Sequence, residues 1–309
     1  MLGFWRPLLL ILCALSLRAE SVEPLSLTRV SDVVWVAVGE TAAPSYQNAG
    51  HNNNLSIILG DAEVMVVNGG DNAWLAERLH AAIRRLTDKP VTWVINENGQ
   101  GHAFLGNSYW RDQGARLFAH QDALADIQSR GEFVLDAMRK RNREKASGTA
   151  IALPEAIAED RWIVPIGGVE VQVLRFGPAH SPGDVSVWLP GEGILIAGDI
   201  AFHERIPGVF PETDVREWLA SYDRMRRLPI RLIVPGHGHP TIENDTKETT
   251  YNYLKYLWEA SMAILDEGGG LSEAYEIDQS AFAHLDTFDE LAVKNAGRVF
   301  QQVEMIFFE

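Results

Sequence analysis

Two stretches of the chain have the same design, Gly193-Ile-Leu-Ile-Ala-Gly-Asp199 and Arg231-Leu-Ile-Val-Pro-Gly-His-Gly-His239. In each, a short apolar run typical of a buried strand leads through glycine to a side chain that can ligate a metal. Loops at strand ends are where a rigid scaffold presents functional side chains, and glycine lets the backbone come close to a bound ion. The two stretches therefore predict strands that bring Asp199 and His237 to the same edge of the fold.

Two further loops carry histidine after a predicted strand. The strand Val91–Ile95 runs into a Gly-rich loop that contains His102, and the strand Val169–Leu174 is followed by a loop that contains His180. Imidazole and carboxylate ligands suit zinc and iron, and a site built from them needs no cysteine. We therefore predict that His102, His180, Asp199 and His237 converge on one metal site.

The order of elements predicts a layered α/β protein. Short β-rich runs are followed by an amphipathic helix near residues 74–86, and a second series of runs is followed by another helix over residues 214–228. Beyond Thr246 the apolar spacing is mostly helical. Two packed sheets with helices outside is the layer arrangement that this order favours.

At this point the sequence resembles the metallo-β-lactamase superfamily. The resemblance rests on motifs in the family's order: Val66-Val-Asn-Gly-Gly70, Gly106-Asn107, Gly177-Pro-Ala-His-Ser-Pro-Gly-Asp184, Leu195-Ile-Ala-Gly-Asp199 and Val234-Pro-Gly-His-Gly238. It implies a four-layer αββα sandwich with a metal site between the sheet edges. On this basis we expect a metallo-β-lactamase-like domain over residues 24–245 and a helical extension over residues 246–309 packed on the same domain.

The first metal motif of that family is degenerate in this chain. The family pattern His-x-His-x-Asp-His corresponds to Asn98, Gln100, His102 and Ala103 when Gly106 is the anchor, whereas a one-residue slip would align His102 with the last histidine. Neutral amides are weak ligands beside imidazole, so one of the two family metal positions should be empty or loose.

The resemblance implies that His102, Asp199 and His237 hold the other ion, with His180 as a fourth ligand or a proton-transfer group. We expect one divalent ion per chain, with zinc as the first choice and iron as the alternative. Asp199 and His180 are the expected catalytic residues.

Other polar residues have structural interpretations. His120 reads as a hydrogen-bonded histidine at a strand end, and His239 should point away from the site. Glu97 stands beside the metal loop as a base or ligand, although a solvated or salt-bridged role is favoured. The basic run Arg139–Arg143 is interpreted as a solvated helix face or mobile flap, with a binding patch as the alternative. The opposing interpretation of the whole site is a family member that keeps the fold without the metal.

Composition and the N-terminus restrict partners and location. The chain has 309 residues, with 42 acidic and 27 basic side chains and a net charge of −15, which argues against nucleic acid as a partner. Arg6, the apolar run Pro7–Leu17 and Ala19 predict a signal peptide over residues 1–19, with an uncleaved anchor as the alternative. We therefore expect a periplasmic or secreted protein, not stably inserted in a membrane, whose only cysteine, Cys13, is lost with the leader.

The leading functional hypothesis is a metal-dependent hydrolase in which metal-activated water attacks an ester, lactone or amide-type bond of a small molecule. The alternatives are a non-hydrolytic accessory protein that binds a partner in a periplasmic quinoprotein-type oxidation system, and a mononuclear iron redox enzyme. The iron alternative follows from the two-histidine, one-carboxylate set.

Overall fold

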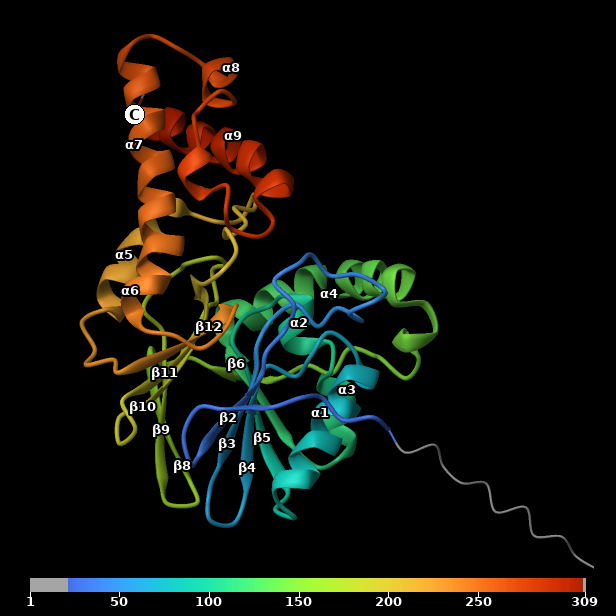
Figure 1. Cartoon of the computed structure of the whole chain (residues 1–309). Coiled ribbons are helices and arrows are strands. Elements are labelled where there is room, and N and C mark those ends of the chain that lie inside the picture. The colour runs from blue at the N-terminus through green and yellow to red at the C-terminus, as the bar shows by residue number, and fades with distance from the viewer. Residues whose placement is uncertain (1–21, 308–309) are drawn as a thin grey trace, which may run out of the picture.

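Two β-sheets lie face to face in the computed structural model, which describes residues 22–307 (Figure 1). The first sheet has its strands in chain order: β1 (Thr28–Arg29), β2 (Val34–Ala37), β3 (Leu55–Leu59), β4 (Val64–Val67), β5 (Val91–Asn96), β6 (Arg116–His120) and β7 (Glu155–Ile157). The strands β1 to β4 pair antiparallel, and β4 to β7 pair parallel.

The second sheet has the order β12-β11-β10-β9-β8. Its strands are β8 (Arg161–Ile166), β9 (Val169–Leu174), β10 (Ser186–Leu189), β11 (Ile194–Phe202) and β12 (Leu232–His237). The pair β11–β12 is parallel, and the other pairs are antiparallel. Strand β8 was not expected from the sequence; it contains Pro165, which lacks a donor and is tolerated because β8 lies at the edge of the sheet.

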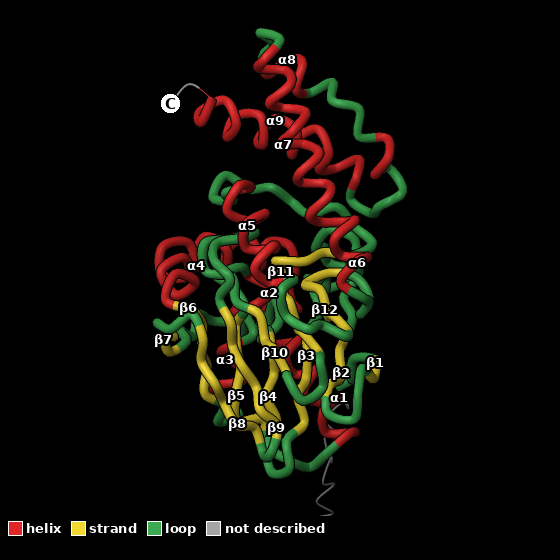
Figure 2. The backbone as a smooth tube through the Cα atoms, turned by 90° about the vertical axis from the view of Figure 1, so that its left-hand side faces the viewer, coloured by secondary structure: helices red, strands yellow, loops and turns green. Residues whose placement is uncertain are grey.

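The two sheets share one apolar core. Inward-facing side chains of both sheets, among them Ile58, Met65, Val187 and Ile196, are almost fully buried and form one cluster. Figure 2 shows the strands of the two sheets running broadly alongside one another, as expected for two sheets packed face to face.

Helices cover the outer faces of both sheets (Figure 1). The first sheet is covered by α1 (Ala73–Leu86), α2 (Gly101–Phe104), α3 (Asn107–Asp112) and α4 (Gln121–Asn142). The second is covered by α5 (Val215–Met225), α6 (Glu243–Thr246) and α7 (Asn252–Asp266), with α8 (Leu271–Ala274) and α9 (Phe288–Phe307) stacked beyond them. Helix α1 packs on the first sheet because one of its faces is apolar. Leu75, Leu79 and Ile83 recur at helical spacing on that face and are buried against the sheet.

The C-terminal helices share a core with the second sheet. Tyr253 and Leu257 of α7 and Phe300 of α9 are fully buried in the cluster that also contains Trp218 of α5 and Phe202 of β11. This packing places the start of α9 beside the loops that follow β11.

The predicted fold class is confirmed: the chain forms two central sheets with helical layers outside. The sequence prediction was wrong in placing Asp199 and His237 in loops after strands. Strand β11 extends to Phe202 and β12 ends at His237, because the parallel β11–β12 pairing continues, with register shifts, past Gly198.

The predicted signal peptide, residues 1–19, lies outside the described residues. Within residues 22–307, none of the helices combines the length and apolar character needed to cross a bilayer.

Candidate metal centre

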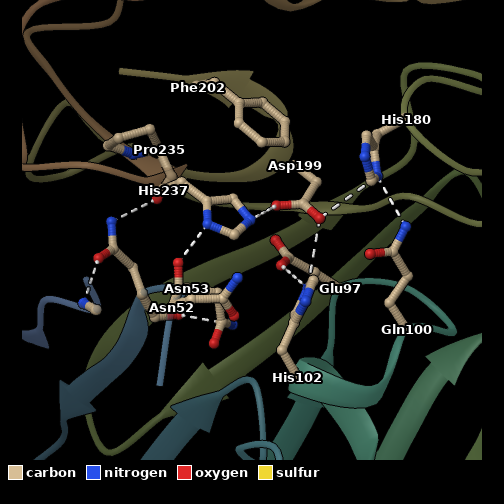
Figure 3. A network of polar contacts seen from close by, with 12 residues as sticks. Asn52, Asn53, Glu97, Gln100, His102, His180, Asp199, Phe202, Pro235 and His237 are labelled. Atoms are coloured by element: carbon tan, nitrogen blue, oxygen red, sulfur yellow. Dashed lines mark hydrogen bonds and ion pairs between the residues drawn. The ribbon is translucent and has the colours of Figure 1, made fainter. Parts of the chain in front are cut away.

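Three side chains from separate elements meet at the end of the two sheets (Figure 3). His102 lies on α2, directly after the loop that follows β5, while Asp199 lies within β11 and His237 ends β12. Gly198 has φ = +68°, a left-handed conformation that glycine adopts without strain, and turns the strand so that Asp199 points into the site.

The Asp199 carboxylate is the centre of this cluster. Its Oδ2 lies 3.3 Å from His102 Nε2, and its Oδ1 lies 3.3 Å from His237 Nε2. Ligand atoms of the three residues all lie within 4.8 Å of one another, and all three residues are buried. These residues could bind a metal ion.

Unsatisfied atoms support that interpretation. Asp199 Oδ1 and His102 Nε2 are buried and make no hydrogen bond of acceptable geometry, although they lie near possible partners. A buried carboxylate and imidazole without proper hydrogen bonds are costly unless another group satisfies them. A cation between the three side chains would satisfy both atoms, so the residues present fit a divalent metal ion.

The protonation of the cluster without metal is set mainly by Asp199. Burial opposes a charged His102, but the Asp199 and Glu97 carboxylates outweigh it and raise the pKa of His102 to about 10. Burial also opposes ionisation of Asp199, but His102 and His237 hold the pKa of that carboxyl well below its usual range. Burial lowers the pKa of His237 to about 4, and nearby Arg205 contributes to this shift.

His237 is held in one orientation by a backbone group. Its Nδ1 hydrogen-bonds the carbonyl oxygen of Asn52, and its ring stacks on Phe202 with centroids 4.8 Å apart (Figure 3). A hydrogen bond at one ring nitrogen fixes which nitrogen is free to ligate. Nε2 of His237 therefore faces the site.

His180 lies beside the cluster but not within it. Its Nδ1 is 3.5 Å from Asp199 Oδ2, yet it is not among the three residues whose ligand atoms all lie within 4.8 Å. The same Nδ1 is 2.9 Å from Gln100 Nε2. Burial lowers the pKa of His180 to about 4, so this imidazole is neutral near pH 7.

The two amides of the degenerate motif hydrogen-bond residues of the site. Asn98 Nδ2 donates to Asp199 Oδ2 over 3.3 Å, and Gln100 Nε2 donates to His180 Nδ1. Donors aimed at the carboxylate and the imidazole occupy the acceptor positions that a second ion would need. The two amides therefore orient the Asp199 and His180 side chains.

Glu97 is buried, so the solvated alternative of the sequence interpretation is wrong, whereas the salt-bridged alternative matches its contact with His102. Its Oε1 accepts a hydrogen bond of 2.8 Å from Asn68 Nδ2 and lies 3.5 Å from His102 Nε2, whereas its Oε2 has no partner. Burial, reinforced by the Asp199 charge, raises the pKa of Glu97. Glu97 directly follows the end of β5, which places it at the edge of the sheet beside the site.

The other histidines lie apart from the cluster. His120 ends β6 and caps α4, with its Nδ1 accepting from Asp122 N over 3.2 Å. His239 is exposed and lies 2.8 Å from a carboxylate oxygen of Glu204. His51 Nε2 contacts the Ala37 carbonyl oxygen over 3.3 Å.

A cavity of about 340 Å³ opens onto the site. Its polar part includes His102, His180 and His237, and its opposite wall is formed by side chains of α4 together with Phe210 and Leu291. The basic end of α4 is therefore not only a solvated face or flap, because one of its side chains reaches the cavity. Arg141 from that end lines the cavity and pairs with the buried Asp71, with Nη2 2.6 Å from Oδ1.

Comparisons with known proteins agree with this architecture. The sequence profile described as "Metallo-beta-lactamase superfamily" matches residues 104–237, beginning just after the degenerate motif. The chain is 25% identical over 251 residues to the "Metallo-beta-lactamase type 2" of Bacteroides fragilis, a match that covers 75% of this chain and 88% of the relative. It is 21% identical over 244 residues to the "Linear primary-alkylsulfatase" of a Pseudomonas species; this match covers 66% of this chain and only 46% of that relative.

Solved structures show the same fold. A metallo-beta-lactamase from Pontibacter korlensis superposes with a TM-score of 0.62 at 17% identity, covering 75% of this chain and 99% of that one. The DIM-1 metallo-beta-lactamase gives a TM-score of 0.60 at 15% identity, covering 76% and 99%. The two-sheet architecture, the matching profile and these relatives together support membership of the chain in the metallo-beta-lactamase superfamily.

Proposed function

We propose that this protein is a metal-dependent hydrolase with one divalent ion, zinc, held by His102, Asp199 and His237. The observation that carries the proposal is the convergence of these three buried side chains, with unsatisfied ligand atoms, beside a cavity large enough for a small molecule. Three protein ligands leave positions open for water and substrate, the arrangement of catalytic zinc sites.

A divalent ion at this position would supply the Lewis acidity that activates water and polarises the bond under attack. The chain's own residues supply orientation. Asp199 accepts a hydrogen bond from Asn98 and lies 3.3 Å from the Nε2 atoms of His102 and His237, and these contacts orient its carboxylate.

His180 has a defined role in this proposal. Its Nδ1 accepts the hydrogen bond from Gln100 Nε2, so the proton of the neutral ring lies on Nε2. A ring in that state is a hydrogen-bond donor near neutral pH. We therefore assign His180 to donating a hydrogen bond to the substrate, in preference to removing a proton from water.

The substrate class that we propose is an ester, lactone or amide-type bond. The experiment is hydrolysis of a panel of such compounds by untagged protein whose metal content has been measured by elemental analysis. Asp199→Asn and His237→Ala should abolish activity and bound metal together, whereas the exposed His239→Ala should keep both. Activity that survives in Asp199→Asn would contradict the proposal.

A second candidate is a mononuclear iron enzyme, because two histidines and one carboxylate are also the ligand set of non-haem iron centres. The same elemental analysis separates the two candidates. Stoichiometric iron, with no hydrolysis of the panel, would favour the second.

We further propose that the protein is exported and acts in the periplasm or outside the cell, on the basis of the predicted signal peptide. Intact-mass measurement on protein recovered from the periplasm tests this. A mass that includes residues 1–17 would contradict cleavage.

A further inference from the structure

The segment between β11 and α5, residues 203–214, forms part of the cavity wall without regular secondary structure. It contains no helix and, apart from one isolated bridge, no strand pairing. Even so, Val209 is fully buried and Thr213 is 3% exposed, while Gly208 and Phe210 line the cavity beside the metal centre. Buried backbone N–H and C=O groups outside helices and strands are costly unless other groups pair with them. This wall therefore depends on partners from elsewhere in the chain.

Two side chains of α9 pair with the middle of this segment. Asn295 is fully buried; its Nδ2 donates to the Pro207 carbonyl oxygen over 2.8 Å, and its Oδ1 accepts from Val209 N over 2.9 Å. Arg298 Nη1 donates to the Val209 carbonyl oxygen. Side chains of one helix thus satisfy three backbone groups that would otherwise have lost water on burial without gaining a partner.

Gln302 continues this arrangement at the end of the segment. It follows Asn295 by seven residues, which is about two helical turns, so both side chains lie on one face of α9. Gln302 Nε2 donates to the Thr213 carbonyl oxygen over 2.8 Å, and its Oε1 accepts from Val215 N over 2.9 Å. Val215 is the first residue of α5, and an N–H at that position has no partner within its own helix. Gln302 therefore supports the segment and the start of α5 together.

Thr213 connects this segment to His180. Its Oγ1 donates to the His180 carbonyl oxygen over 2.8 Å and accepts from Phe210 N over 3.0 Å. The Phe210 ring in turn meets the His180 imidazole in a T-shaped contact, with centroids 5.1 Å apart. The backbone and the ring of His180 are therefore both held by the segment that α9 fixes.

We propose that α9 belongs to the machinery of the metal centre, although Figure 1 places this helix beyond the two-sheet body of the protein. Asn295 and Gln302 are positioning residues: they fix the wall formed by residues 203–214 and, through Thr213, hold His180 where it can reach a substrate. The proposal rests on the proposed function, since the reaction depends on α9 through the hydrogen bond that His180 donates. Displacing such a group by about 1 Å can cost about a hundredfold in rate.

The test compares two pairs of variants of the full chain. Gln302→Leu removes both hydrogen bonds of a half-buried side chain, and Gln301→Leu makes the same change one residue away, on the exposed side of α9. Thr213→Val removes the hydroxyl that bonds His180, and Thr213→Ser keeps it.

The first measurement is amide hydrogen exchange after chelator treatment. In Gln302→Leu the amide of Val215 should exchange at least about tenfold faster than in the wild type, because its acceptor is gone. Gln301→Leu should exchange as the wild type does. Fast exchange of the Val209 and Val215 amides in the wild type would overturn the proposal whatever the variants do.

The second measurement reports on His180 itself and separates positioning from simple stabilisation. In protein with nitrogen-15 in its histidine rings, the His180 resonances, assigned with His180→Ala, should shift in Gln302→Leu and in Thr213→Val. Thr213→Ser should restore them, and the resonances of the exposed His239 should stay unchanged throughout. Lower stability of both variants with unmoved His180 resonances would overturn the proposal. If one of the two variants does not fold, the other decides by the same resonances.

The third measurement is hydrolysis, and it separates this proposal from the proposed function. For a compound that the wild type hydrolyses, kcat/KM should fall at least about tenfold in Gln302→Leu and in Thr213→Val, with metal content unchanged. Shifted His180 resonances in a protein that hydrolyses no compound of the panel would refute the hydrolase and keep the positioning role. Hydrolysis that depends on Asp199 but is unchanged in both variants would refute the positioning role and keep the hydrolase.

Discussion

Metal binding to the metal-free protein should release one proton, and this proton should come from His102. The Asp199 and Glu97 carboxylates raise the pKa of His102 to about 10, whereas a metal ligand must be the neutral imidazole. His237 already has a pKa of about 4 and gives up no proton near neutral pH. Asp199 is ionised, because its pKa lies well below the usual range.

The size of the effect follows from these values. At about pH 6, a group with a pKa near 10 is essentially fully protonated, so roughly one proton is displaced per ion bound. Apparent metal affinity should then rise about tenfold per pH unit between roughly pH 6 and 7, which is about 1.4 kcal/mol of binding free energy per unit. Protons are best counted near pH 6, because a metal-activated water would have a pKa near 7 and would not yet lose a proton there.

The assay is isothermal titration calorimetry of zinc into chelator-treated protein at about pH 6, in two buffers with different ionisation enthalpies. The difference between the two apparent enthalpies gives the number of protons released. Glu97→Gln is the control, since it removes the neighbouring carboxyl whose pKa is also raised. Release of no proton would refute the assignment of His102 as a displaced imidazolium. Release of two protons by the wild type and one by Glu97→Gln would show that Glu97 also loses a proton, which contradicts the one-proton expectation.

Three more predictions follow from the same structure. His102→Ala should lose most of the bound metal and His120→Ala should keep it, as measured by elemental analysis after dialysis; equal metal contents would contradict the site. Gly198→Ala should destabilise the protein by about 2–5 kcal/mol, since alanine is strained at φ = +68° and its Cβ would collide with a buried carboxylate. Gly114→Ala, at φ = +91° with open space around it, should cost only about 1–2 kcal/mol in chemical denaturation, and equal losses would refute the collision argument. Burial, reinforced by the Asp199 charge, raises the pKa of Asp184 from 3.8 to about 8, so its contribution to the stability of metal-free protein is complete below pH 3.8 and is lost as pH rises through 8; Asp184→Asn should flatten the fall in the free energy of unfolding over that range, and a urea series with an unchanged slope would exclude this cause.

Local patterns in the sequence predicted most of the strands, the first helix and the resemblance to the family. The spacing of Leu75, Leu79 and Ile83 predicts the α1 face that is buried against the first sheet, and the apolar runs before Asp199 and His237 predict β11 and β12. These features depend on neighbours within a few residues, since helical and strand periodicity follow from backbone geometry alone.

Features that join distant parts of the chain were decided only by the tertiary structure. Burial of Glu97 depends on the packing of the segment after β5 against Gly198 of β11. The pairing of Arg141 with Asp71 likewise joins residues 70 positions apart. Whether a charged side chain is solvated, paired or left open depends on which segments pack around it in space, and no spacing along the chain records that.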